Sequence, residues 1–144
     1  MHIVECDACG KKNRVPAAAK GKPRCANCQS PLPWITEADD SSFASVVEAS
    51  ALPVLLDLWA PWCGPCRAVS PAVEQLGHDF AGQVKVVKVN VDDAPATASR
   101  FGVQGIPTLI VMHHGTVVER QTGAAPASVL RSWLEQGLKA AARD

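Results

Sequence analysis

The chain has no long apolar run and no recognisable targeting segment. A helix that crosses a bilayer needs roughly 20 consecutive, mainly apolar residues, and every apolar stretch of this 144-residue sequence is interrupted well before that length. The chain begins Met-His-Ile-Val-Glu-Cys, where a secretory signal peptide would have a basic start followed by an apolar stretch. We therefore expect a cytoplasmic protein with no membrane partner.

The chain also lacks a net charge, because 14 Lys and Arg residues balance 14 Asp and Glu residues. The two signs are unevenly placed: residues 1–35 are basic and the remainder is acidic. A basic segment can indicate contact with nucleic acid. However, no aromatic side chain precedes Trp34, so nothing in this segment can stack on a base. We interpret it as a solvated basic loop or as a patch that faces the acidic remainder, and we expect no nucleic-acid partner.

Four of the six cysteines lie in the first 33 residues as two Cys-x-x-Cys pairs, Cys6 with Cys9 and Cys25 with Cys28. Each pair can aim two thiolates at one ion, and four thiolates satisfy tetrahedral zinc. The segment has few large apolar residues, and so short a piece needs a metal or disulfides to fold. We predict a zinc ribbon at residues 1–33 with one structural zinc ion. Two structural disulfides, or an unstructured tail with incidental cysteines, are the alternatives.

Residues 34–144 alternate between strand-like and helix-like patterns after a linker that contains two prolines. The nearly continuous apolar run from Val54 to Trp59 is typical of a central strand covered on both faces. His114-Gly115 predicts a hairpin, and Ser41 or Ser42 is expected to cap the first helix. Strands are predicted at 34–36, 54–59, 84–91, 109–112 and 116–122, and helices near 43–47, from 64, at 96–101 and from 126. This pattern predicts an α/β fold, a mixed sheet with helices on both faces.

The other two cysteines, Cys63 and Cys66, directly follow the central apolar run, with Gly64 and Pro65 between them. This spacing puts two thiols between a buried strand and the start of a helix. The free N–H groups and the positive dipole end of the helix favour a thiolate there. Because the thiolate is the nucleophile in disulfide exchange, the sequence predicts that Cys63 is reactive at neutral pH.

Asp57 is a charged residue inside the central apolar run. Strand alternation points its side chain inward, and burial of an unpaired carboxylate raises its pKa. A carboxyl group of this kind suits proton transfer to and from Cys66. An exposed Asp with no role is the alternative interpretation.

The segment Trp62-Cys63-Gly64-Pro65-Cys66 after an apolar strand resembles the active site of the thioredoxin family. Gly105-Ile106-Pro107-Thr108, the segment from Lys88 to Asp92, and Gly123 resemble other parts of that family in the same order. The resemblance covers roughly residues 34–143 and implies the thioredoxin fold, with a cis peptide bond before Pro107. With the cysteine-rich segment ahead of it, the chain is similar to the bacterial thioredoxin-2 type.

The resemblance also implies an enzyme that reduces protein disulfides. Cys63 is then expected to attack the substrate and Cys66 to release it, with Asp57 as general base and Lys88 as its charge partner. The resemblance implies disulfide-containing protein substrates and recycling by thioredoxin reductase, and we expect no organic cofactor and a monomer. The residues expected to bind substrate are Trp62, Gly64, Pro65, Gly105, Ile106, Pro107 and Gly123. The alternative function is a zinc-dependent module that binds a partner or senses oxidation.

Overall fold

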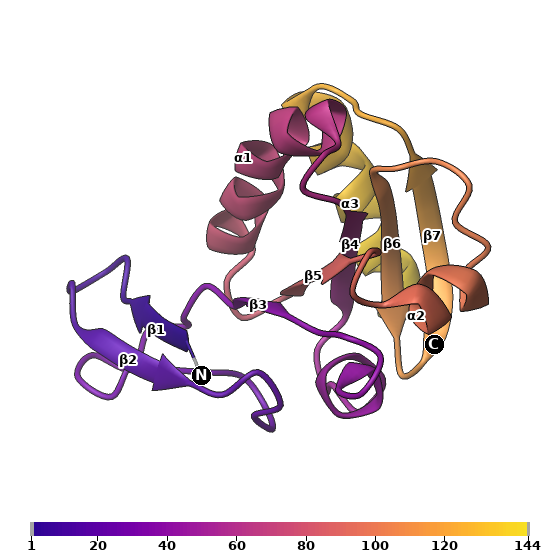
Figure 1. Ribbon diagram of the computed structural model, residues 1–144. Helices are drawn as coiled ribbons and strands as arrows, with labels where there is room; N and C mark the ends of the chain where they lie inside the picture. Colours follow the sequence, from indigo (N-terminus) through magenta and orange to yellow (C-terminus); the bar gives the residue numbers. More distant parts are fainter. Residues whose placement is uncertain (1, 144) are drawn as a thin grey trace.

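A five-stranded mixed sheet forms the centre of the computed structural model, which describes residues 2–143 (Figure 1). Across the sheet the order is β3 (Ile35–Glu37), β5 (Lys85–Asn90), β4 (Val54–Trp59), β6 (Thr108–His113) and β7 (Thr116–Thr122). β4 pairs in parallel with β5 and antiparallel with β6. The edge strand β3 pairs in parallel with β5, and the edge strand β7 pairs antiparallel with β6. β4 is thus the central strand, as its continuous apolar run predicts.

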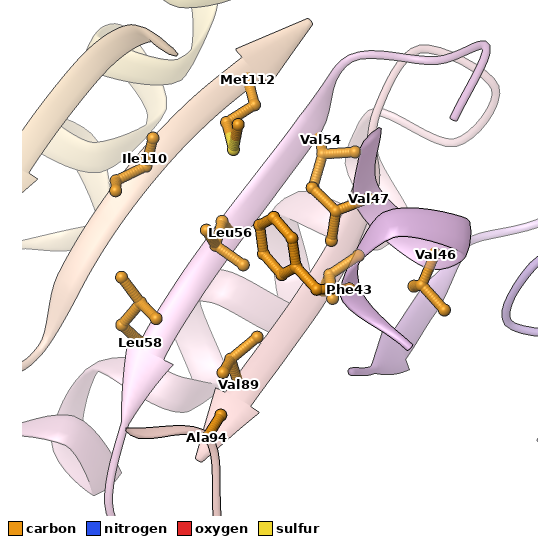
Figure 2. Packing of buried hydrophobic residues seen from close by; sticks show 11 residues of the cluster. Phe43, Val46, Val47, Val54, Leu56, Leu58, Val89, Ala94, Ile110 and Met112 are labelled. Carbon is orange, nitrogen blue, oxygen red and sulfur yellow. The ribbon is translucent and has the colours of Figure 1, made fainter. Parts of the chain in front are cut away.

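Helices cover both faces of this sheet, and successive residues of β4 point to opposite faces. On one face, α1 (Gly64–Asp79) and α3 (Ala127–Ala141) pack against Leu55 and its neighbours. On the other face, η1 (Ala44–Glu48) and the segment around α2 (Pro95–Arg100) close a second core around Leu56 (Figure 2). This arrangement confirms the predicted α/β fold. No helix within residues 2–143 combines the length and the apolar character that a membrane span requires.

The first helix differs from the prediction in its cap. η1 is a single turn, closed by a hydrogen bond of 2.9 Å from the Ala49 N–H to the Ala44 carbonyl oxygen. Neither Ser41 nor Ser42 caps it, so that expectation is wrong. Instead, Asp39 Oδ1 accepts from the backbone N–H groups of both serines at 3.0 Å. A carboxylate accepts such bonds better than a hydroxyl, because it carries the full negative charge.

The hairpin predicted at His114-Gly115 connects β6 to β7. Residues His113 and Thr116 are paired, so the turn has two residues, and both have positive φ angles of 51° and 79°. That combination is typical of the tight turn that matches the twist of antiparallel strands.

Residues 2–33 form a small two-stranded unit that shares its apolar core with the rest of the chain. β1 (His2–Glu5) and β2 (Lys12–Val15) pair antiparallel and have no counterpart in the sequence prediction. Val15 packs with Leu32, and also with Trp34 and Leu52 from beyond the linker. The prediction that this segment has almost no core is therefore incomplete, because the missing apolar side chains come from distant positions.

Polar contacts also hold this unit against the larger sheet. The buried Lys85 ammonium donates to the carbonyl oxygens of Ala17 at 2.5 Å and Val46 at 2.6 Å, and lies 4.1 Å from the centre of the Trp34 ring. Burial lowers the pKa of Lys85 to about 8. Asp7 pairs with His78 of α1 at 2.8 Å. The larger sheet and α1 thus supply the side chains of Lys85 and His78 to these contacts.

The basic residues of the first 33 positions make no ion pair with the acidic remainder in the described part of the chain. All of them are exposed, and within residues 2–143 none forms an ion pair. Of the two interpretations of this segment, the structure therefore supports the solvated basic surface. These residues are Lys11, Lys12, Arg14, Lys20, Lys22 and Arg24.

Candidate functional site

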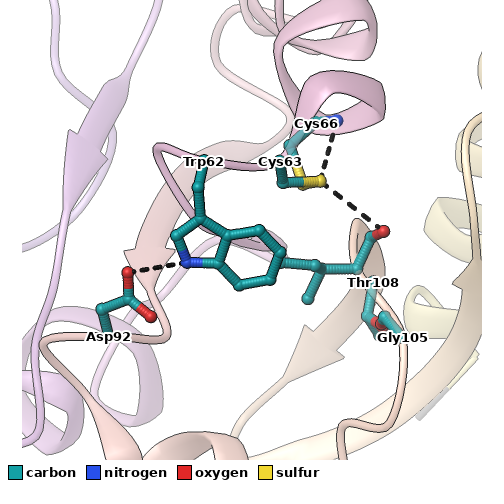
Figure 3. The surroundings of a disulfide bond; sticks show 7 residues. Trp62, Cys63, Cys66, Asp92, Gly105 and Thr108 are labelled. Carbon is teal, nitrogen blue, oxygen red and sulfur yellow. Dashed lines mark hydrogen bonds between the residues drawn. A yellow bond between two sulfur atoms is a disulfide. The ribbon is translucent and has the colours of Figure 1, made fainter.

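Cys63 and Cys66 form a disulfide at the start of α1, directly after β4 (Figure 3). Their Cα atoms lie 5.3 Å apart, in the usual range for a disulfide. Cys63 is the N-cap residue, and its Sγ accepts a hydrogen bond of 3.2 Å from the backbone N–H of Cys66. Pro65 lies in the first turn, where a helix needs no N–H donor from it. In the reduced protein, the Cys66 N–H and the helix dipole stabilise a thiolate at Cys63.

A loop ahead of β6 faces the two cysteines. The peptide bond between Ile106 and Pro107 is cis, as the resemblance implies. The Ile106 carbonyl oxygen lies 3.7 Å from Cys63 Sγ (Figure 3). Gly123 has a φ angle of 89°, and its N–H donates to the Pro107 carbonyl oxygen at 2.8 Å. The structure therefore brings segments some 40 and 60 positions apart to one edge of the site.

The surface beside the cysteines is a shallow, mainly apolar groove of about 350 Å³. Trp62 is 68% exposed and lines it, and the indole N–H donates to Asp92 at 3.0 Å (Figure 3). Gly64, Pro65 and Gly105 are exposed as well, whereas Pro107 is buried and faces inward. The other lining residues are Val91, Pro95, Ala98, Val103, Gln104, Gly105 and Ile106.

The sequence analysis assigned no role to Asp92. It follows β5, just as Trp62 follows β4, and these two strands are parallel. Because parallel strands end at the same edge of a sheet, the segments after them are neighbours. The contact between Asp92 and Trp62 could therefore have been predicted from the sequence by assuming that these two strands are parallel.

Asp57 is buried in β4, with only 2% of its surface exposed. It points to the same face as Leu55, which packs against α1. Oδ1 has no hydrogen-bond partner in the described part of the chain. Burial raises the pKa of Asp57 to about 6, while the charge of Lys88 opposes this shift and the charge of Glu74 adds to it. A carboxyl group with this pKa can take up and release a proton near neutral pH.

Lys88 lies beside Asp57 in the register of β4 and β5. Its ammonium donates to Ser70 Oγ at 2.6 Å and to Glu74 Oε1 at 3.0 Å, both on α1. No ion pair joins Lys88 to Asp57 within residues 2–143. The expected charge partner is thus a neighbour in the sheet, but its ammonium is bound to the helix. The sequence analysis did not identify Ser70 and Glu74.

The four remaining cysteines, which form the two Cys-x-x-Cys pairs of residues 2–33, converge at one point. All four Sγ atoms lie within 4.8 Å of one another; Cys6 and Cys28 are 3.6 Å apart and Cys9 and Cys25 are 3.5 Å apart. Sulfurs bound tetrahedrally to zinc at about 2.3 Å are roughly 3.8 Å apart, so the cluster has the size of a zinc site. Asn13 Nδ2 donates to Cys25 Sγ at 3.5 Å. Such donors stabilise metal-bound thiolates.

Comparison with known proteins identifies relatives named as thioredoxins. Residues 34–136 match the family model described as Thioredoxin. A thioredoxin of Haemophilus influenzae is 50% identical over 98 residues, which is 68% of this chain and 92% of that protein. A thioredoxin of Synechocystis is 48% identical over 102 residues, or 71% of this chain and 95% of that protein. The chloroplastic thioredoxin M4 of Arabidopsis thaliana is 43% identical over 99 residues, or 69% of this chain and 51% of that protein.

Proposed function

Since the chain belongs to the thioredoxin family of thiol–disulfide oxidoreductases, we propose that it reduces protein disulfides through Cys63 and Cys66. The observation that carries this proposal is the dithiol at the start of α1, beside the groove of Trp62 and the Ile106–Pro107 loop. The groove offers apolar surface, and the loop offers backbone groups to an extended substrate segment. Both features suit recognition of many protein substrates rather than one small molecule.

In the first step, the Cys63 thiolate attacks one sulfur of the substrate disulfide. A bond forms between Cys63 Sγ and that sulfur as the substrate S–S bond breaks, and the other substrate sulfur leaves as a thiolate and takes up a proton. Cys63 is the attacking group because it is the N-cap residue and lies beside the exposed Trp62. Cys66 lies one turn inside the helix.

In the second step, the Cys66 thiol transfers its proton to the Asp57 carboxylate and the resulting thiolate attacks Cys63 Sγ. The Cys63–Cys66 disulfide forms as the mixed disulfide breaks, and the second substrate sulfur leaves and is protonated. Two electrons thus pass from the dithiol to the substrate. The buried position of Asp57 and its raised pKa support this role. Thioredoxin reductase then reduces the Cys63–Cys66 disulfide back to the dithiol. The mechanism needs no organic cofactor bound to this chain.

We assign residues 1–33 to a zinc ribbon and residues 34–144 to the thioredoxin domain, the arrangement of a cytoplasmic, monomeric thioredoxin-2. Cys6, Cys9, Cys25 and Cys28 would hold one zinc ion. Four sulfurs leave no open coordination position, so the metal is structural and takes no part in electron transfer. Cys9 and Cys28 are exposed, which favours oxidation sensing by the ribbon as a second candidate function. Zinc stoichiometry before and after treatment with peroxide tests it.

Reduction of insulin by the wild-type protein and three variants tests the leading proposal. Cys63→Ser should show no turnover, because no other thiolate stands at that helix start. Cys66→Ser should react once and stay linked to its substrate, so that mass spectrometry identifies the mixed disulfide. Ser45→Ala is the control, since Ser45 is exposed and lies in η1, outside the site. Substantial turnover by Cys63→Ser would show that the nucleophile is misassigned.

A further inference from the structure

Lys88 occupies a position between two acidic side chains of the sheet and one of the helix. It lies in register with Asp57 of β4 on one side and with Glu37 of β3 on the other. Residues in register point to the same face of a sheet, and this face is covered by α1. The Lys88 ammonium therefore has more than one carboxylate nearby, and the positions of the side chains around it determine which one it binds.

In the structure, Lys88 pairs with the helix. Ser70 and Glu74 are four residues apart on α1, so they lie on one face of that helix. Together they accept two hydrogen bonds from the ammonium, at 2.6 Å and 3.0 Å. The buried Asp57 has no ion pair in the described part of the chain, and its Oδ1 has no hydrogen-bond partner there.

We propose that Ser70 and Glu74 are positioning residues of the exchange reaction: they hold the Lys88 ammonium against α1, and so leave the Asp57 carboxyl group free to exchange a proton with Cys66. A direct Lys88–Asp57 ion pair would stabilise the carboxylate and make it a poor proton acceptor. Without any cation nearby, the buried carboxyl group would hold its proton too tightly. This inference rests on the proposed role of Asp57 in the second step.

The charges around Asp57 are consistent with this arrangement. Lys88 faces it from β5, while Glu74 acts on it from α1; β6 contributes Leu109, which has no charge. Glu37 of β3 lies beyond Lys88. Glu74 raises the pKa of Asp57 through its own charge, and it also binds the cation that lowers it. Removing Glu74 therefore acts on Asp57 in one direction by both routes.

Direct titration of Asp57 tests the positioning role. In the oxidised protein, carbon NMR of the Asp57 carboxyl group should show that Glu74→Gln increases its acidity about three- to tenfold, because Lys88 is released toward it. Ser70→Ala should act in the same direction with a smaller effect, and Lys88→Met should act in the opposite direction. In the Lys88→Met background, the effect of Glu74→Gln should shrink, because no ammonium remains to be released.

Glu48→Gln is the matched control, because Glu48 also pairs with a cation at the surface, Arg100 at 3.2 Å, but lies in η1 on the other face of the sheet. It should leave the Asp57 titration unchanged. The attack of Cys66 is measured as the second release of thiolate in a single-turnover reaction with a small aromatic disulfide. Its pH profile should move toward lower pH in Glu74→Gln, in step with the Asp57 titration.

Two results would overturn the inference, and they have different meanings. If neither Glu74→Gln nor Ser70→Ala changes the Asp57 titration, the two residues do not position Lys88, and the proposed function stands. If the titration moves but the pH profile of the Cys66 step does not follow, Asp57 is not the proton acceptor, and the mechanism of the second step is wrong. If the wild-type protein did not reduce insulin at all, the proposed function itself would be contradicted.

Discussion

Replacing Asp57 by Asn should stabilise the protein above neutral pH while slowing its reaction. The side chain is only 2% exposed, and burial raises its pKa from 3.8 to about 6. The folded protein therefore binds this proton more tightly than the unfolded chain does. Ionisation of Asp57 is an unfavourable term that is fully present above about pH 6 and disappears below about pH 4.

The size of this term follows from the shift. A difference of about two pKa units corresponds to about 3 kcal/mol, so Asn should increase the free energy of unfolding by up to about 3 kcal/mol near pH 8. The gain should fall to about half of that value near pH 5, because much of the wild-type Asp57 is then protonated in the folded protein. Asn keeps the shape of the side chain and removes only the titrating group.

Denaturant unfolding of the oxidised, zinc-loaded proteins at a series of pH values measures the difference. Asp93→Asn is the matched control, because Asp93 is exposed and its replacement should change stability by no more than about 0.5 kcal/mol at any pH. A difference between Asp57→Asn and wild type that does not vary with pH would refute the reasoning. So would a less stable variant near pH 8, because it would show that the carboxylate is well compensated in the folded protein.

Three further predictions concern the groove and the zinc ribbon. Trp62→Ala should raise KM for insulin roughly tenfold with little change in kcat, because the exposed indole contacts substrate and not the sulfurs; an unchanged KM would remove it from the substrate surface. Metal analysis should find one zinc ion per chain, and a chelator should shift Trp34 fluorescence to the red while insulin reduction persists, because Trp34 packs in the ribbon core. An unshifted spectrum would show that the packing around Trp34 does not depend on zinc. Lys85→Met should speed amide hydrogen exchange in residues 16–20 by about tenfold or more, because the bond to Ala17 is lost; unchanged exchange would show that Lys85 does not tether the ribbon.

The elements of residues 34–143 were predictable because their apolar patterns are strong and local. β4 has a continuous apolar run, and α1 places Val69, Val73 and Leu76 on one face. The reactive pair was predictable for the same reason, since its chemistry depends on the end of one strand and the start of the next helix. Asp57 was identified because a carboxylate is costly to bury and is therefore unusual inside an apolar strand.

The features that the sequence did not predict depend on contacts between distant segments. The core of the ribbon needs Trp34 and Leu52, which lie 19 and 37 positions beyond Val15. Residues 2–33 alone show too few apolar side chains, and only the folded chain supplies the others. Asp39 is a different case, because its contacts with Ser41 and Ser42 are local: the sequence offered three side chains that can cap, and the backbone conformation decides that Asp39 accepts the bonds.

Lys88 shows why a resemblance can identify a residue and still leave its contacts open. Its position beside Asp57 follows from the pairing of two strands, which the order of the motifs implies. The partner of its ammonium depends instead on which side chains α1 presents over the sheet. Ser70 and Glu74 stand four residues apart there, so both reach the same ammonium. A four-carbon side chain can turn toward either carboxylate, and the additional hydrogen bond from Lys88 to Ser70 favours the helix. The proton affinity of the buried carboxyl group is therefore set partly by two helix positions outside the motifs on which the resemblance rests.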